Sequence, residues 1–140
     1  MNNIEQRNAY AATILRIALG IMFLAHAYLK IAVFTPAGTV GFFESIGLPG
    51  FLAYLTIGAE VIGGIMLIVG YYTHYAAALL LPLLIGSILF VHSGNGWLFS
   101  NEGGGWEYPL FLTVAAAASS MLGNGAFALQ NRFARMKKAA

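Results

Sequence analysis

The chain has 140 residues, of which 59% are hydrophobic and only 9% are charged. An average globular domain is about half apolar and about a quarter charged, so this chain cannot cover itself with a solvated surface. The composition excludes a water-soluble enzyme domain. It predicts an all-α integral membrane four-helix bundle, with residues 1–140 forming a single membrane domain, because each span needs about 20 residues.

Cysteine content and charge exclude further classes of protein. The chain has no cysteine, which excludes disulfides and thiolate metal sites. The net charge of +2 comes mainly from Lys and Arg near the termini, so a nucleic-acid partner has no basic surface to bind. We therefore expect the lipid bilayer, and no nucleic acid, as a partner.

The first predicted span covers residues 10–34 and carries Arg16, His26 and Lys30. It ends before Thr35, where a Pro and a Gly follow and interrupt the helical pattern. In the loop beyond, apolar residues recur at helical spacing from 39 to 46. We expect this segment to form a short helix at the outer membrane interface.

The second and third predicted spans cover residues 51–70 and 75–92. The second holds Glu60 at its midpoint, and the third ends at His92. The next loop, residues 93–106, contains five glycines, which predicts a flexible cover or a loop that binds a partner.

The fourth predicted span covers residues 108–129 and follows Glu107, with Pro109 as a helix start signal. Arg7 precedes the first span, and four basic residues follow the fourth span. The positive-inside rule therefore places both termini of this multi-pass protein in the cytoplasm. An even number of spans is then required, and four satisfies this condition.

Glu60 and Arg16 are the charged residues expected to lie deepest in the membrane, where an ionised side chain has a high free-energy cost. An ionised side chain at mid-depth costs on the order of 3 kcal/mol, so Glu60 must be neutral or paired. Counted from the cytoplasmic helix ends at Gly70 and Ala9, Glu60 lies about 15 Å deep and Arg16 about 10 Å deep. This predicts an Arg16–Glu60 ion pair, which either takes part in substrate binding or only locks two helices together.

A second group of candidates lies towards the outer face: His26, Lys30, His92 and Glu107. Lys and His can donate hydrogen bonds to the oxygens of an anionic or quinonoid head group, and a carboxyl–imidazole couple can carry protons near neutral pH. The alternative interpretation is that Lys30 reaches lipid phosphates, while His92 and Glu107 remain in interfacial water.

Two histidines at matched depth also raise the question of a haem or metal site. The chain has no Glu-x-x-His, no paired-His helix and no haem attachment motif. We therefore predict no metal and no certain cofactor, with quinone as the remaining candidate.

Several stretches, in this order and spacing, resemble DoxX-family membrane proteins. They are residues 15–23 (LRIALGIMF), Lys30, 42–50 (FFESIGLPG), 60–64 (EVIGG) and 70–74 (GYYTH). The resemblance covers almost the whole chain, although Asn124 replaces the Pro of a Gly-Pro-Gly-like close. It implies a bacterial inner (plasma) membrane protein with four helices, from a family linked to quinone-dependent redox chemistry and to oxidative stress.

The motif match carries over Arg16, Lys30 and Glu60, but no particular reaction. We expect a redox-associated protein that binds a quinone-like or other small amphipathic molecule within the bundle. The alternatives are a non-catalytic membrane scaffold or partner subunit of an oxidoreductase complex, and a small-solute carrier. The sequence leaves open whether the protein is catalytic and whether it forms a homo-oligomer.

Overall fold

The computed structural model describes residues 2–139, and these residues form helices and turns with no strand. The α-helices are α1 (Asn3–Tyr28), α2 (Pro36–Ser45), α3 (Phe51–Val69), α4 (Thr73–Ser87), α5 (Glu107–Leu122) and α6 (Leu129–Ala139). Two π-helical turns, η1 (Leu29–Val33) and η2 (Ile88–His92), extend α1 and α4, and a 3-10 turn, η3 (Ser93–Asn95), follows η2.

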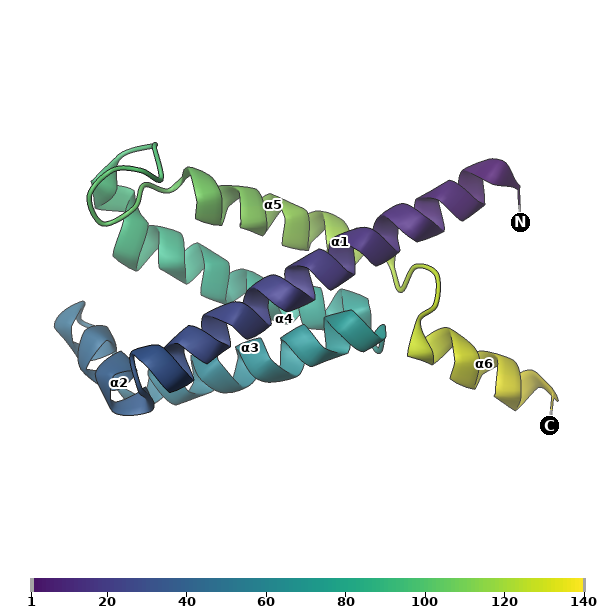
Figure 1. The fold of residues 1–140 in the computed structure, drawn as a ribbon, viewed down its shortest axis with the longest axis horizontal. Helices are drawn as coiled ribbons and strands as arrows, with labels where there is room; N and C mark the ends of the chain where they lie inside the picture. The colour runs from purple at the N-terminus through teal and green to yellow at the C-terminus, as the bar shows by residue number, and fades with distance from the viewer. Residues whose placement is uncertain (1, 140) are drawn as a thin grey trace.

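Four of these helices form the bundle. α1 contacts α3 and α5, α3 contacts α4, and α4 contacts α5, which closes the ring. Figure 1 shows α2 and the loop before α5 at one end, which we call the loop end. The N-terminus and α6 lie at the opposite end, which we call the terminal end, and α6 stands apart from the bundle. The predicted all-α bundle is confirmed.

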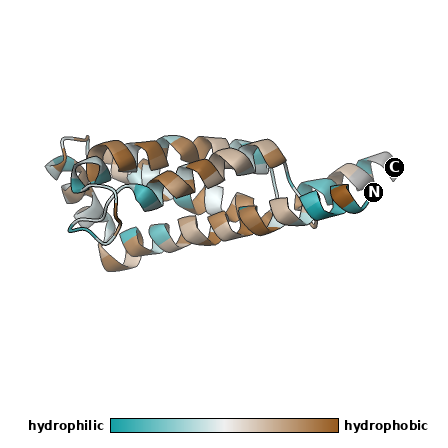
Figure 2. Ribbon diagram, turned by 90° about the horizontal axis from the view of Figure 1, so that it is seen from above, coloured by the Kyte–Doolittle hydropathy of each residue, from teal (hydrophilic) through white to brown (hydrophobic). Residues whose placement is uncertain are grey.

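The bundle is apolar inside and outside. Inside the bundle, a cluster of buried apolar side chains contains Leu19, Phe23, Leu67, Ala76, Ala77, Leu80, Leu84, Leu112 and Ala116. Large side chains such as Ile14, Ile21, Ile62, Leu79 and Phe111 are more than half exposed on the outside. Figure 2 shows hydrophobic residues along the length of the bundle and hydrophilic ones concentrated near its ends. This distribution suits a surface solvated by lipid rather than by water.

Within residues 2–139, three helical segments are long and apolar enough to cross a membrane: Asn3–Val33, Phe51–Val69 and Thr73–Asn95. α5 has 16 residues, which correspond to about 24 Å, somewhat less than the ~30 Å hydrocarbon core. The chain is therefore a membrane protein, and the crossing of the bilayer by α5 stays a prediction.

Two helix boundaries differ from the sequence-based ranges. α1 begins at Asn3 instead of residue 10, because the Asn2 and Glu5 side chains each accept a backbone hydrogen bond in a capping box. α5 ends at Leu122 instead of continuing to residue 129. The following Gly123 has a φ of +76°, which ends the helix and lets the chain turn towards α6.

The short helix predicted for residues 39–46 exists as α2, which begins a few residues earlier. Thr35 accepts a hydrogen bond from the Gly38 amide at 3.1 Å, and Pro36 occupies the first helical turn. Proline is favoured there because its missing amide donor is not needed.

Candidate functional site

Lys30 and Glu60 form an ion pair between α1 and α3. The Lys30 Nζ lies 2.8 Å from one Glu60 carboxylate oxygen and 3.0 Å from the other. The Glu60 side chain is 7% exposed and that of Lys30 is 19% exposed. Glu60 is thus neutralised by a partner, as hydrocarbon requires, and the lysine side of the pair is more accessible than the glutamate side.

Lys30 lies in a distorted part of the first helix. The π-helical turn η1 is closed by the Phe34 amide, which donates to the Leu29 carbonyl at 2.8 Å. The buried Thr39 hydroxyl of α2 lies 3.3 Å from the Lys30 carbonyl oxygen, so α2 contacts the backbone that carries the lysine. Single π-helical turns are rare and are frequently found at functional sites.

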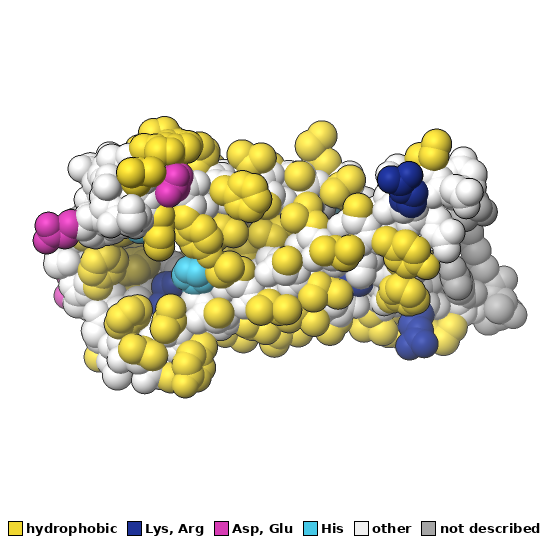
Figure 3. All heavy atoms as spheres, turned by 45° about the horizontal axis from the view of Figure 1, so that its top comes forward, with side chains coloured by type: hydrophobic (Ala, Val, Ile, Leu, Met, Phe, Trp, Pro, Cys, Tyr) yellow, Lys and Arg dark blue, Asp and Glu magenta, His cyan; other side chains and the backbone are white. Residues whose placement is uncertain are grey.

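His26 lies one turn before Lys30 and is half-buried. Its Nδ1 is 2.9 Å from the Met22 carbonyl oxygen. Because a carbonyl can only accept, Nδ1 carries the proton, and Nε2 of the neutral ring is an acceptor. His26 lies within electrostatic range of the Glu60 carboxylate. Figure 3 shows a histidine and a basic side chain beside a hollow in a largely apolar face.

Tyr108 of α5 also reaches this group of residues, and the sequence analysis did not include it among the candidates. Its hydroxyl lies 2.7 Å from the Met22 sulfur, and its ring centroid lies 5.1 Å from that of Phe99. In the sequence, Tyr108 is a tyrosine near the start of a predicted span. Tyrosines are common at membrane interfaces, so this position alone does not indicate a binding site.

The predicted Arg16–Glu60 ion pair is wrong. Arg16 is 2% exposed, and its guanidinium lies at the end of α3 nearest the termini. It donates to the carbonyl oxygens of Leu67 at 2.7 Å and of Ile68, and to those of Asn124 at 2.9 Å and Ala126 at 3.1 Å. Arg16 therefore binds backbone oxygens of α3 and of the segment that follows α5.

The position of Arg16 has a simple electrostatic cause. The last carbonyls of a helix have no partner within the helix and carry partial negative charge, so a cation is stabilised there. Gly70, with a φ of +76°, ends α3, and a Cβ at this position would lie 3.1 Å from the Arg16 Cζ. The arginine thus joins α1, α3 and the segment after α5, and this role is structural.

His92 and Glu107 hold the loop of residues 93–106 in place. Neither side chain forms a hydrogen bond to Lys30 or Glu60. The His92 Nδ1 is 2.8 Å from the Gly104 carbonyl oxygen, and Glu107 accepts from the Phe99 amide at 2.8 Å. The Asn95 amide group donates to the carbonyls of Val91, Gly103 and Gly104 at 3.0–3.1 Å. The loop predicted as a flexible cover is therefore held by hydrogen bonds on both sides.

The described residues enclose a cavity at each end of the bundle. At the loop end, an open groove of about 580 Å³ runs along the start of α5 and is lined by aromatic and aliphatic side chains with Glu107 and Tyr108. At the terminal end, a cavity of about 410 Å³ lies between α1 and the start of α6. Through Tyr108, the first cavity adjoins the Met22 side chain and thus the turn that carries His26.

The described residues contain no group of three His, Asp or Glu side chains that could hold a metal ion. The six predicted site residues fall into three places: the terminal end of α3 (Arg16), the α1–α3 contact (His26, Lys30, Glu60) and the outer loop (His92, Glu107). Of these places, the α1–α3 contact is the one where charged side chains are largely buried and a ligand can still reach the lysine.

Known proteins that are similar to this chain point to one family. The DoxX family model matches residues 11–93, which is more than half of the chain. A Haemophilus influenzae protein, described as an uncharacterized protein, is 34% identical over 134 residues, covering 95% of this chain and 98% of that protein. A Bacillus subtilis protein named "Putative oxidoreductase CatD" is 36% identical over 100 residues, covering 71% of each chain. No solved structure matches. The chain therefore belongs to the DoxX family of membrane proteins.

Proposed function

We propose that this DoxX-family protein is associated with membrane redox chemistry and binds a quinone-like molecule beside the Lys30–Glu60 ion pair. The observation that carries the proposal is the pair itself, a lysine and a carboxylate held together within an apolar bundle with the lysine partly accessible. Charged side chains within a membrane-spanning bundle carry a high free-energy cost, and they usually mark a functional site. The relative named as an oxidoreductase supports the redox association.

The donors and acceptors of the site fit the oxygens of a quinone head group. A lysine ammonium has three N–H donors, and Glu60 takes two, so one remains for a ligand oxygen. His26 leaves Nε2 as an acceptor, and the described residues provide it with no partner. A quinone supplies two-electron, two-proton redox chemistry when bound.

In this proposal, each residue has one role. Lys30 donates a hydrogen bond to the ligand oxygen, and Glu60 holds the ammonium in place. His26 accepts or returns a proton at Nε2, because imidazole is the side chain best suited to proton exchange near neutral pH. Tyr108 and Phe99 form an aromatic wall near the turn that carries His26. His92 and Glu107 act indirectly, because they hold the loop that covers this end of the bundle.

The proposal includes the location of the protein. We place it in the bacterial inner membrane with both termini in the cytoplasm, because Arg7 and the basic residues of α6 flank the terminal end. The Lys30–Glu60 pair then lies nearer the outer leaflet than the inner one.

Quinone binding can be measured on the purified protein through its own tryptophans. Trp97 and Trp106 lie at the loop end with ring centroids 4.6 Å apart, and a bound quinone quenches nearby indole fluorescence. Titration with a short-chain ubiquinone should give saturable quenching, with Kd about tenfold higher in Lys30→Gln and Glu60→Gln, because each variant loses a charge-assisted hydrogen bond.

Glu102→Gln is the matched control, because it removes the same charge from an exposed position of the outer loop. Its quenching curve should equal that of the wild type. Identical curves in all three variants would contradict the proposal. The pair would then serve only to lock α1 against α3, as expected for a membrane scaffold or a partner subunit of an oxidoreductase complex. A small-solute carrier would instead show flux in sealed vesicles.

A further inference from the structure

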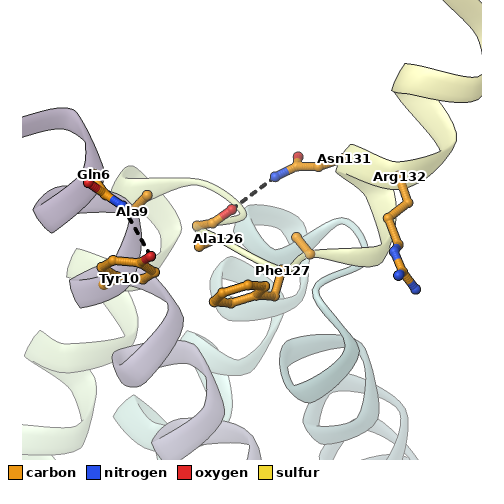
Figure 4. Close-up of a pocket in the computed structure, with 9 residues that line it drawn as sticks. Gln6, Ala9, Tyr10, Ala126, Phe127, Asn131 and Arg132 are labelled. Atoms are coloured by element: carbon orange, nitrogen blue, oxygen red, sulfur yellow. Dashed lines mark hydrogen bonds between the residues drawn. The ribbon is translucent and has the colours of Figure 1, made fainter. Parts of the chain in front are cut away.

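A second cavity lies far from the Lys30–Glu60 pair, between the first turns of α1 and the start of α6 (Figure 4). It has a volume of about 410 Å³. Gln6 and Tyr10 line it from α1, Phe127 from the connecting segment, and Asn131 and Arg132 from α6. None of its lining residues is acidic.

The cavity lies at the level where lipid headgroups are expected. Tyr10 and Tyr28 belong to the same helix, and their separation along it is about 27 Å at 1.5 Å per residue. This distance is close to the ~30 Å thickness of the hydrocarbon core. We therefore expect Tyr10 to lie near the membrane boundary, and Gln6, one turn earlier, to lie among the headgroups.

Two aromatic rings form the apolar side of the cavity. The rings of Tyr10 and Phe127 are stacked, with centroids 6.0 Å apart and planes inclined by 23°. Figure 4 shows Phe127 pointing from the connecting segment towards Tyr10. Phe127 is 80% exposed and has a φ of +57°, a left-handed conformation that is strained for a large side chain. A lipid chain beside this ring would remove its exposed apolar surface from water.

The polar side of the cavity carries positive charge without a matching carboxylate. Arg132 is exposed, and no described residue forms an ion pair with it. Asn131 fixes the beginning of α6, because its side-chain amide donates to the Gly125 carbonyl at 2.9 Å. Gln130 holds the same turn to the end of α3, since its backbone amide donates to the Gly70 carbonyl at 3.2 Å.

We propose that this cavity binds the headgroup of an anionic phospholipid. The Arg132 guanidinium donates to the phosphate, the Gln6 amide faces the glycerol and ester oxygens, and the acyl chain passes along Tyr10 and Phe127. The planar guanidinium matches the geometry of phosphate oxygens, and an anionic phospholipid combines a phosphate with an apolar chain. The bound lipid would add a link between α1 and α6, whose first turn is already held at the end of α3.

Lipid binding can be measured by native mass spectrometry on the full chain in detergent after delipidation. Added phosphatidylglycerol should bind as a discrete adduct more tightly than phosphatidylcholine. Arg132→Gln should weaken phosphatidylglycerol binding about fivefold, since one basic residue near an anionic headgroup contributes roughly that factor. Arg7→Gln is the matched control: Arg7 is exposed at the same end but does not line the cavity, so binding should change by less than twofold.

Phe127→Gly gives a second test that does not depend on charge. Glycine suits the left-handed φ, so the variant should fold at least as well as the wild type while losing the aromatic wall and much of the lipid binding. Equal losses in Arg132→Gln and Arg7→Gln would overturn the proposal, because they would indicate unspecific attraction. So would equal affinity for phosphatidylcholine, or displacement of the lipid by inorganic phosphate, which would indicate a site for soluble anions.

Discussion

Gly20 of α1 and Gly64 of α3 face each other at backbone contact distance. A Cβ on Gly20 would lie 2.7 Å from the Gly64 carbonyl oxygen, and a Cβ on Gly64 would lie 3.0 Å from the Gly20 carbonyl oxygen. Small residues let two membrane helices approach in this way. The contact fixes how far α1 is shifted along α3, and this shift determines which charged side chains can meet.

Replacing either glycine of this contact should destabilise the bundle. Gly20→Ala places a methyl group against backbone, so we expect a loss of about 1–3 kcal/mol in the free energy of unfolding. Gly58→Ala is the control on α3, because a Cβ there meets nothing within 4 Å. Unfolding in mixed detergent micelles measures both variants, and equal stability of Gly20→Ala and the wild type would show that the helices are not in contact there.

Arg16 should not tolerate replacement by lysine. A lysine keeps the charge but lacks the planar fork that reaches the carbonyls of both α3 and the segment after α5. Each buried carbonyl left without a donor costs about 1–3 kcal/mol. We therefore expect Arg16→Lys to lower the midpoint of thermal unfolding clearly, whereas Arg7→Lys, at an exposed position, leaves it unchanged. Full stability of Arg16→Lys would contradict the structural role of Arg16.

Asn95 should control the order of the outer loop. Its side-chain amide donates to three carbonyl oxygens, so Asn95→Ala releases the segment around Gly103 and Gly104. Hydrogen exchange of the backbone amides there should become about tenfold faster or more. Ser100→Ala changes an exposed residue of the same loop and should have no effect. Unchanged exchange in Asn95→Ala would show that other contacts hold the loop.

The membrane orientation can be tested with single cysteines, because the chain has none of its own. Ser100→Cys lies in the outer loop, and Asn3→Cys lies at the terminal end; both positions are exposed. A membrane-impermeant maleimide should label Ser100→Cys in intact spheroplasts and Asn3→Cys only after lysis. The reverse pattern would invert the orientation, and equal labelling of both in intact cells would contradict the predicted number of spans.

Much of the helical architecture could be predicted from the sequence. Apolar length alone indicated the long helices, and the helical spacing of apolar residues from 39 to 46 indicated α2. The cost of a charge in hydrocarbon correctly required a partner for Glu60. The sequence analysis predicted the membrane span of the first helix, whereas the helix itself begins earlier, because the capping box extends it into the polar N-terminal segment.

The identity of the Glu60 partner could not be predicted, because it depends on the shift between two helices. The depth estimate assumed that Ala9 and Gly70 lie at the same level. In the structure Gly70 lies beside Arg16, so α1 extends well beyond the end of α3. Glu60 is consequently brought level with the region of His26 and Lys30. Nothing in a single sequence marks the Gly20–Gly64 contact as the one that sets this shift.

The most direct measurement separates the structural contribution of the Lys30–Glu60 pair from ligand binding. Lys30→Met and Glu60→Met each leave one charge without its partner, and each should destabilise the bundle. The double variant replaces the pair by apolar side chains and should recover most of the stability. If the pair binds a quinone head group, the double variant shows no saturable quenching of tryptophan fluorescence by short-chain ubiquinone despite being folded. Quenching with the affinity of the wild type would contradict the account.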